Sequence, residues 1–71
     1  MTNNIKSERA RLDMTQDDLA NEIGVDAGTI RRWEKGDTDV PSSKATKMSK
    51  LFNCSIDYLF GLTDERQSIK A

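Results

Sequence analysis

The sequence predicts an all-α protein, a compact bundle of five short helices. Two patterns support this prediction: the same capping signal recurs along the chain, and no segment alternates apolar and polar residues as a strand does. The size agrees, because 71 residues, of which 35% are hydrophobic and four are aromatic, can build one modest core. We expect a single domain over residues 1–62 and a polar tail over residues 63–71.

Three of the expected helices begin at a residue that can cap the free backbone N–H groups. Thr15 caps the second helix, where Asp18 completes a capping box, Asp26 caps the third and Ser55 caps the fifth. An apolar residue precedes each cap, as in a hydrophobic staple. Cys54 occupies that position before Ser55, so we expect it to pack as a small hydrophobic residue.

The first and fourth helices follow from the spacing of apolar residues. A helix over residues 3–12 places Ile5 and Leu12 on one face. Residues 41–43 begin a second such segment, which Asn53 can end because it tolerates a left-handed backbone. Both helices are expected to be amphipathic and to contribute one apolar stripe to the core.

A tight turn is expected between the second and third helices. Gly24 follows Ile23, the last apolar residue of the second helix, and glycine adopts the positive φ that such a turn requires. Residues 15–35 therefore predict a helix-turn-helix, in which the third helix lies across the second.

The net charge of −1 hides an uneven distribution along the chain. Residues 1–26 carry three basic and six acidic side chains, whereas residues 27–50 carry six basic and three acidic ones. A charged helix face is often no more than a solvated surface. The distribution nevertheless places the positive charge on and after the third helix, where a helix-turn-helix would meet an acidic partner.

A helical wheel separates the third helix into two faces. Ile30 and Trp33 lie on the apolar face, so we expect Trp33 in the core and not stacked on a base. The opposite face carries small and basic residues: Ala27, Gly28, Arg31, Arg32 and Lys35. Small residues at the start of a helix and arginines one turn later suit entry into the major groove of double-stranded DNA.

Other classes of protein find little support in the sequence. Histidine is absent, Cys54 is the single cysteine, and the four glycines do not form a phosphate-binding loop. We therefore expect no enzymatic activity, metal, cofactor or small-molecule ligand. No apolar run approaches the length of a membrane span, and the polar start of the chain lacks a secretory signal, which predicts a cytoplasmic protein without a membrane partner.

Four segments, in matching order and spacing, resemble the Cro/CI repressor family, also called the XRE family. They are Met14–Ala20, Ile23–Val25, Thr29–Gly36 and Phe52–Gly61, within a similarity that covers about residues 5–61. The resemblance implies a fold of the lambda-repressor type and a regulator that binds operator DNA through its second and third helices. Phage and bacterial regulators are common in the family, so we expect a repressor of this kind.

The resemblance also implies roles for individual residues. Gln16, at the start of the second helix, matches a phosphate contact, and the residues that match base contacts are Ala27, Gly28, Arg31 and Arg32. Arg9 and Glu34 match a pair that joins the first and third helices by a salt bridge and orients the recognition helix.

Phosphate contacts are expected from Lys35 and Lys44, so binding should weaken steeply with salt. The chain departs from the family in carrying Asp37 and Asp39 where basic residues are common, and Glu8 where an apolar residue is usual. We therefore expect weak non-specific affinity for DNA.

One domain of this size covers little DNA, so we expect a homodimer, at least on a palindromic operator. The candidate dimer contacts are Tyr58, Phe60 and Leu62, although Tyr58 and Phe60 are equally suited to closing the core of the monomer. The alternative function is that of a protein-binding module with the same fold, such as an antitoxin or the partner of an anti-repressor, docked through the acidic first half of the chain.

Overall fold

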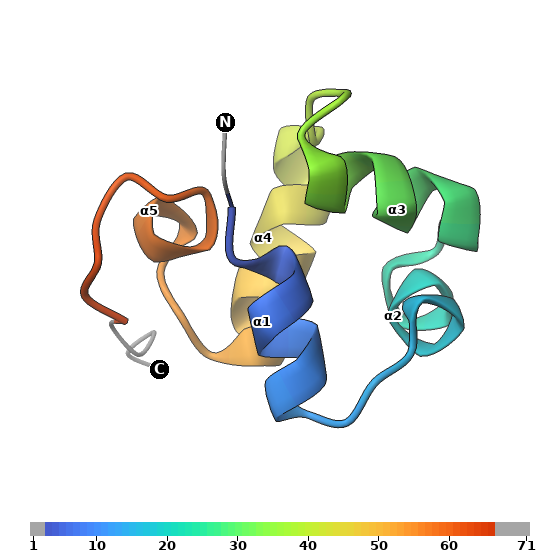
Figure 1. Cartoon of the computed structure of the whole chain (residues 1–71), viewed down its shortest axis with the longest axis horizontal. Helices are drawn as coiled ribbons and strands as arrows, with labels where there is room; N and C mark the ends of the chain where they lie inside the picture. The colour runs from blue at the N-terminus through green and yellow to red at the C-terminus, as the bar shows by residue number, and fades with distance from the viewer. Residues whose placement is uncertain (1–2, 67–71) are drawn as a thin grey trace.

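The computed structural model describes residues 3–66, and this range holds five α-helices (Figure 1). They are α1 (Ile5–Arg11), α2 (Gln16–Ile23), α3 (Ala27–Lys35), α4 (Ser42–Phe52) and α5 (Ile56–Leu59). The prediction of an all-α, five-helix bundle is confirmed. Over the same residues, no helix is long and apolar enough to cross a membrane.

The other three helices flank α1 and α4, which occupy the middle of the molecule in Figure 1. The pair α2 and α3 lies on one side of them, and α5 with the segment that follows it lies on the other. The helix α2 contacts both α3 and α4, while α1 contacts α3. The helix-turn-helix is therefore held against the rest of the bundle from two directions.

One cluster of buried side chains joins all five helices. Its largest members are Ile5, Leu19, Ile23, Ile30, Trp33, Met48, Phe52, Cys54 and Leu59. Trp33 is 4% exposed and Cys54 is fully buried, which confirms that both belong to the core. Burial of one such large apolar side chain stabilises the fold by about 1.5 to 3 kcal/mol.

The three predicted caps are present. Thr15 Oγ1 accepts from the Asp18 N–H, and Asp18 Oδ2 accepts from the Thr15 N–H, each over 3.0 Å, which completes the capping box. Asp26 Oδ1 accepts from the Thr29 N–H over 2.7 Å. Ser55 Oγ accepts from the Tyr58 N–H over 3.1 Å.

The turn between α2 and α3 has the expected backbone. Gly24 adopts φ +86° and its N–H donates to the Ala20 carbonyl over 2.8 Å. A residue with a side chain would be strained at this φ. Asn53, which ends α4, also lies in the left-handed region, at φ +54°.

The start of the chain differs from the prediction, because α1 begins at Ile5 and not at residue 3. Asn3 and Asn4 use their side-chain amides elsewhere: Asn3 Nδ2 donates to the Trp33 carbonyl over 2.7 Å, and Asn4 Nδ2 to the Tyr58 carbonyl over 2.6 Å. Asparagine competes for backbone groups in this way and disfavours the helix interior. The two residues thereby fasten the start of the chain to α3 and α5.

Candidate nucleic-acid interface

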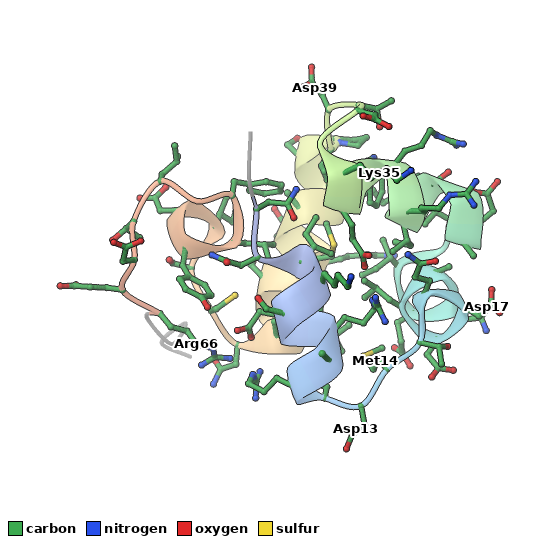
Figure 2. The ribbon with its side chains drawn as sticks, viewed as in Figure 1. Asp13, Met14, Asp17, Lys35, Asp39 and Arg66 are labelled. Atoms are coloured by element: carbon green, nitrogen blue, oxygen red, sulfur yellow. The ribbon has the colours of Figure 1, made fainter. Side chains whose placement is uncertain are left out.

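The outer face of α3 is basic and exposed. Arg31, Arg32 and Lys35 are exposed, while Ile30 and Trp33 anchor the opposite face of the same helix in the core. Figure 2 shows Lys35 on the outer side of α3. The separation of faces that the wheel predicted is therefore present in the structure.

Arg32 is held by its own helix. Its Nη2 donates to Thr29 Oγ1 over 3.2 Å, and a Cβ placed on Gly28 would lie 3.6 Å from its Nη1. Hydrogen bonds from the hydroxyl and the backbone N–H of Thr29 lower the pKa of Asp26, and the charge of Arg32 lowers it further. Thr29 thus links Arg32 to the N-cap of α3, a role that its three-residue spacing from Arg32 could have suggested.

Arg9 and Glu34 form a partly buried ion pair. Arg9 Nε lies 2.7 Å from Glu34 Oε2, and the two side chains are 14% and 6% exposed. Arg9 Nη1 also donates to the Met14 carbonyl over 2.8 Å. The pair places α1, the approach to α2, and α3 in a fixed relation.

Gln16 joins this network from the first position of α2. Its Nε2 donates to Glu34 Oε1 over 3.1 Å. The resemblance gives Glu34 a structural role and Gln16 a phosphate contact, and the structure places these two residues in contact with each other. Sequence spacing alone does not show this contact, because Gln16 and Glu34 lie on different helices.

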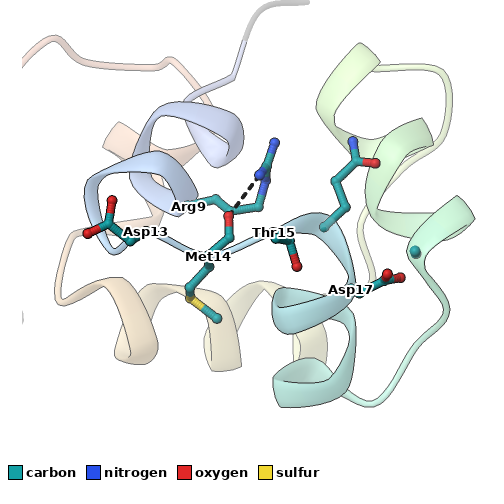
Figure 3. Close-up of a pocket in the computed structure, with 7 residues that line it drawn as sticks. Arg9, Asp13, Met14, Thr15 and Asp17 are labelled. Atoms are coloured by element: carbon teal, nitrogen blue, oxygen red, sulfur yellow. Dashed lines mark hydrogen bonds between the residues drawn. The ribbon is translucent and has the colours of Figure 1, made fainter.

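A hollow opens beside Gln16, at the N-terminal end of α2. Its volume is about 520 Å³, and Figure 3 shows the seven residues that line it: Arg9, Asp13, Met14, Thr15, Gln16, Asp17 and Ala27. The first N–H groups of a helix favour an anion. Ala27 brings the start of α3 to the same hollow, so this end of both helices forms one surface.

Two acidic residues follow α3 in the chain, next to its basic face. Asp37 and Asp39 are exposed in the connection to α4, and Figure 2 shows Asp39 at the outer end of this loop. They reduce the positive potential next to the basic face of α3.

The side chain of Lys44 contacts the end of α2 and not the basic face of α3. Its Nζ donates to the Ile23 carbonyl over 3.3 Å, at the C-terminal end of α2. A cation is favourable at this end of a helix. The structure thus gives Lys44 a structural partner, and its contact with phosphate stays a prediction.

The three candidate dimer residues differ in exposure. Tyr58 and Phe60 are half-buried and pack against the core, whereas Leu62 is 68% exposed. They lie at α5 and just after it, on the side of the bundle away from α2 and α3 (Figure 1). Leu62 is therefore the residue of the three that offers the larger free apolar surface.

The part of the chain that the structure describes contains no candidate metal-binding cluster. Within residues 3–66, no three His, Cys, Asp or Glu side chains gather closely enough to hold a metal ion.

A small helical domain in which a glycine turn sets an exposed basic helix across another helix is a helix-turn-helix protein. Residues 5–59 match the family model described as helix-turn-helix. The chain belongs to this family, in its Cro/CI or XRE branch.

Relatives of full length support the assignment. An uncharacterized HTH-type transcriptional regulator of Methanocaldococcus jannaschii is 38% identical over 65 residues, which are 92% of this chain and 98% of that protein. An uncharacterized HTH-type transcriptional regulator of Bacillus subtilis is 34% identical over 65 residues, with the same coverage.

A phage repressor is similar in both sequence and structure. Repressor protein C2 of Salmonella phage P22 is 32% identical over 59 residues, which are 83% of this chain and 27% of that repressor. The crystal structure of the P22 c2 repressor in complex with a synthetic operator matches 80% of this chain and 86% of that one, with a TM-score of 0.75 and 32% identity.

Proposed function

We propose that this chain is a transcriptional regulator, a repressor, that binds double-stranded DNA by placing α3 in the major groove. The observation that carries the proposal is the exposed basic face of α3, with Arg31, Arg32 and Lys35 outside and Trp33 anchored inside. Similarity to a repressor whose structure includes operator DNA supports it. We propose a cytoplasmic location, because a regulator of this kind acts where the DNA lies.

Base reading is assigned to the two arginines. A guanidinium can donate two parallel hydrogen bonds to O6 and N7 of guanine, so each half-site should contain at least one G·C pair under Arg31 or Arg32. Ala27 and Gly28 let the start of α3 approach the base edges and add only methyl contact or shape.

Backbone contacts are assigned to Gln16 and Lys35. The Nε2 group of Gln16 carries two hydrogens, and Glu34 accepts one of them over 3.1 Å. The second hydrogen and the free N–H groups at the start of α2 remain for a DNA phosphate in the hollow. Glu34 thereby acts as a positioning residue for Gln16 while it pairs with Arg9.

Dimerisation completes the proposal. Two copies would occupy half-sites about 34 Å apart on a palindromic operator. Leu62, with the exposed parts of Tyr58 and Phe60, is the proposed contact between them, because its 68% exposure is high for a large apolar residue.

The decisive experiment is selection of bound duplexes from a random pool, followed by sequencing. We expect an enriched palindrome with a G·C pair in each half-site. The spacing of the half-sites reports the geometry of the dimer. Absence of any enriched duplex at low salt, together with tight binding of a partner protein, would instead establish the protein-binding module.

Two variants separate base contacts from backbone contacts on the selected operator. Arg32→Ala should cost about 1 to 3 kcal/mol of binding free energy and relax the preference at one base pair. Lys35→Ala should weaken binding to all duplexes alike and lower the salt dependence by about one ion. Equal losses on operator and random DNA for Arg32→Ala would reassign Arg32 to the backbone.

A further inference from the structure

A buried carboxylate lies on the side of α1 that faces the end of α4. Glu8 is only 3% exposed, in a position where the family resemblance led us to expect an apolar residue. A buried charge without a partner is strongly destabilising. The surroundings of Glu8 therefore need to supply positive charge and hydrogen-bond donors.

Two arginines supply them. Arg66 Nε donates to both carboxylate oxygens, over 3.1 and 3.0 Å, and Arg66 Nη2 donates to Glu8 Oε1 over 2.9 Å. Arg11 Nε donates to Glu8 Oε1 over 3.0 Å. The geometry at Arg66 is the planar pairing of guanidinium and carboxylate, which a lysine cannot reproduce.

The same two arginines also reach the end of α4. Arg11 Nη2 donates to the Phe52 carbonyl over 2.8 Å, and Arg66 Nη2 donates to the same oxygen. The last carbonyls of a helix carry partial negative charge, which favours a cation there. Glu8 and the Phe52 carbonyl together therefore form a site for guanidinium groups.

Arg66 comes to this site from the segment after α5. Gly61 reverses the chain at φ +77°, and the Leu62 N–H donates to the Asp57 carbonyl over 2.8 Å. The segment then returns to α1, and Figure 2 shows Arg66 at the end of its described course. It lies on the side of the bundle away from α3 (Figure 1).

We propose that Glu8 and the Phe52 carbonyl form a guanidinium-binding site that Arg66 fills, so that residues 61–66 act as a strap across α1 and the end of α4. The strap holds Leu62 in a defined place beside α5. This function concerns the side of the molecule opposite the DNA-binding face and does not depend on DNA binding by the chain.

Amide hydrogen exchange at Leu62 tests the strap, because the N–H of this strap residue donates to the Asp57 carbonyl in α5. In Arg66→Ala, we expect exchange at Leu62 to rise about tenfold relative to amides of α2 and α3, a change that corresponds to about 1.4 kcal/mol. Arg11 still pairs with Glu8 in this variant, so the bundle should fold. Unchanged exchange at Leu62 in Arg66→Ala would overturn the proposal.

Two further variants distinguish the planar pairing of guanidinium and carboxylate from the effect of positive charge alone. Arg66→Lys keeps the positive charge but loses the planar pairing, so it should show most of the increase in exchange. Lys6→Ala removes one positive charge from an exposed position of α1 and should show none. An equal response of Lys6→Ala and Arg66→Ala would mean that net charge, and not the site, controls the segment.

Chemical rescue tests the site itself. Methylguanidinium chloride at a non-denaturing concentration should raise the Tm of Arg66→Ala above its value in sodium chloride of equal ionic strength. The double variant Glu8→Gln, Arg66→Ala should show no such rise, because the carboxylate is gone. The same response in the single and double variants would overturn the assignment of Glu8 as the binding group.

Discussion

Arg9 Nε donates to Glu34 Oε2 over 2.7 Å, and this partly buried pair ties α1 to the recognition helix α3. The same carboxylate accepts from Gln16, so one side chain connects α1, α2 and α3. The basic face of α3 and the start of α2 therefore cannot move independently. Their relative position sets which phosphate and which bases the domain can reach at the same time.

Removal of either partner should destabilise the whole domain. Glu34→Ala leaves the partly buried Arg9 guanidinium without its main acceptor, and we expect a loss on the order of 3 kcal/mol in the free energy of unfolding. Urea denaturation measures this loss. Lys35→Ala, at the next position on α3 but exposed, is the control and should change stability by less than about 0.5 kcal/mol.

A double-mutant cycle on Arg9 and Glu34 shows whether the loss belongs to the pair. If the two alanine variants are additive, the pair does not couple the helices, and the fixed relation between α1 and α3 must come from apolar packing alone.

Gly28 is a position where stability and binding should respond in opposite directions. A Cβ on Gly28 would meet Arg32 Nη1 at 3.6 Å and Asp26 Oδ1 at 3.7 Å, which are ordinary contact distances. Gly28→Ala should therefore fit and should stabilise α3 by up to about 1 kcal/mol. If α3 approaches the bases closely at this point, affinity for the selected operator should fall.

Thermal unfolding and operator titration of Gly28→Ala separate the two effects. A variant that gains stability and keeps full affinity would show that Gly28 does not face the DNA.

Acid should weaken the fold through Glu8. Burial raises the pKa of this carboxyl, but hydrogen bonds from Arg66 and Arg11 and the charges of both outweigh burial, so its pKa falls below the ordinary 4.5. A group with a lowered pKa in the folded state stabilises the fold above its unfolded pKa. That contribution is lost as the pH falls from about 4.5 through the folded pKa.

Urea midpoints from neutral pH to about pH 3 test this prediction. Glu8→Gln should be less stable at neutral pH and should lose less stability on acidification. Part of the acid sensitivity should remain, because hydrogen bonds from Thr29 also lower the pKa of Asp26. Parallel curves for the two proteins would contradict the assignment to Glu8.

Local chemistry explains why so much of the fold could be predicted from the sequence. The caps at Thr15, Asp26 and Ser55 depend on backbone N–H groups two or three residues away, and the turn at Gly24 depends on one residue. The two faces of α3 follow from helical periodicity. The Arg9–Glu34 pair needed the family resemblance, because nothing local brings these two residues together.

Other contacts between distant parts of the chain could not be predicted. Arg66 belongs to a stretch that composition alone assigns to a polar tail, yet it binds Glu8, 58 residues earlier. Asn3 and Lys44 likewise bond carbonyls on other elements, 30 and 21 residues away. A polar side chain on the surface of one helix gives no sign of which distant carbonyl the packing will bring to it.

Thr29 should influence which base Arg32 selects. Its hydroxyl accepts from Arg32 Nη2 over 3.2 Å, and Thr29→Val removes this acceptor while its backbone N–H still donates to Asp26. Arg32 is exposed, so we expect a modest effect: discrimination at one base pair of the operator should fall on the order of threefold. The pKa of Asp26 should rise, because the Thr29 hydroxyl is the main cause of its lowering.

Thr46→Val provides the matched control for this variant. Thr46 is exposed, and its Oγ1 donates to the Ser42 carbonyl over 2.9 Å within α4, away from the basic face of α3. Repeated selection from a random pool measures base preference, and NMR titration measures the pKa of Asp26. If Thr29→Val selects the same operator as the parent with the same discrimination at every position, Thr29 does not position Arg32. A change shared with Thr46→Val would point to altered helix stability and not to the guanidinium, since the two variants have in common only the loss of a threonine hydroxyl.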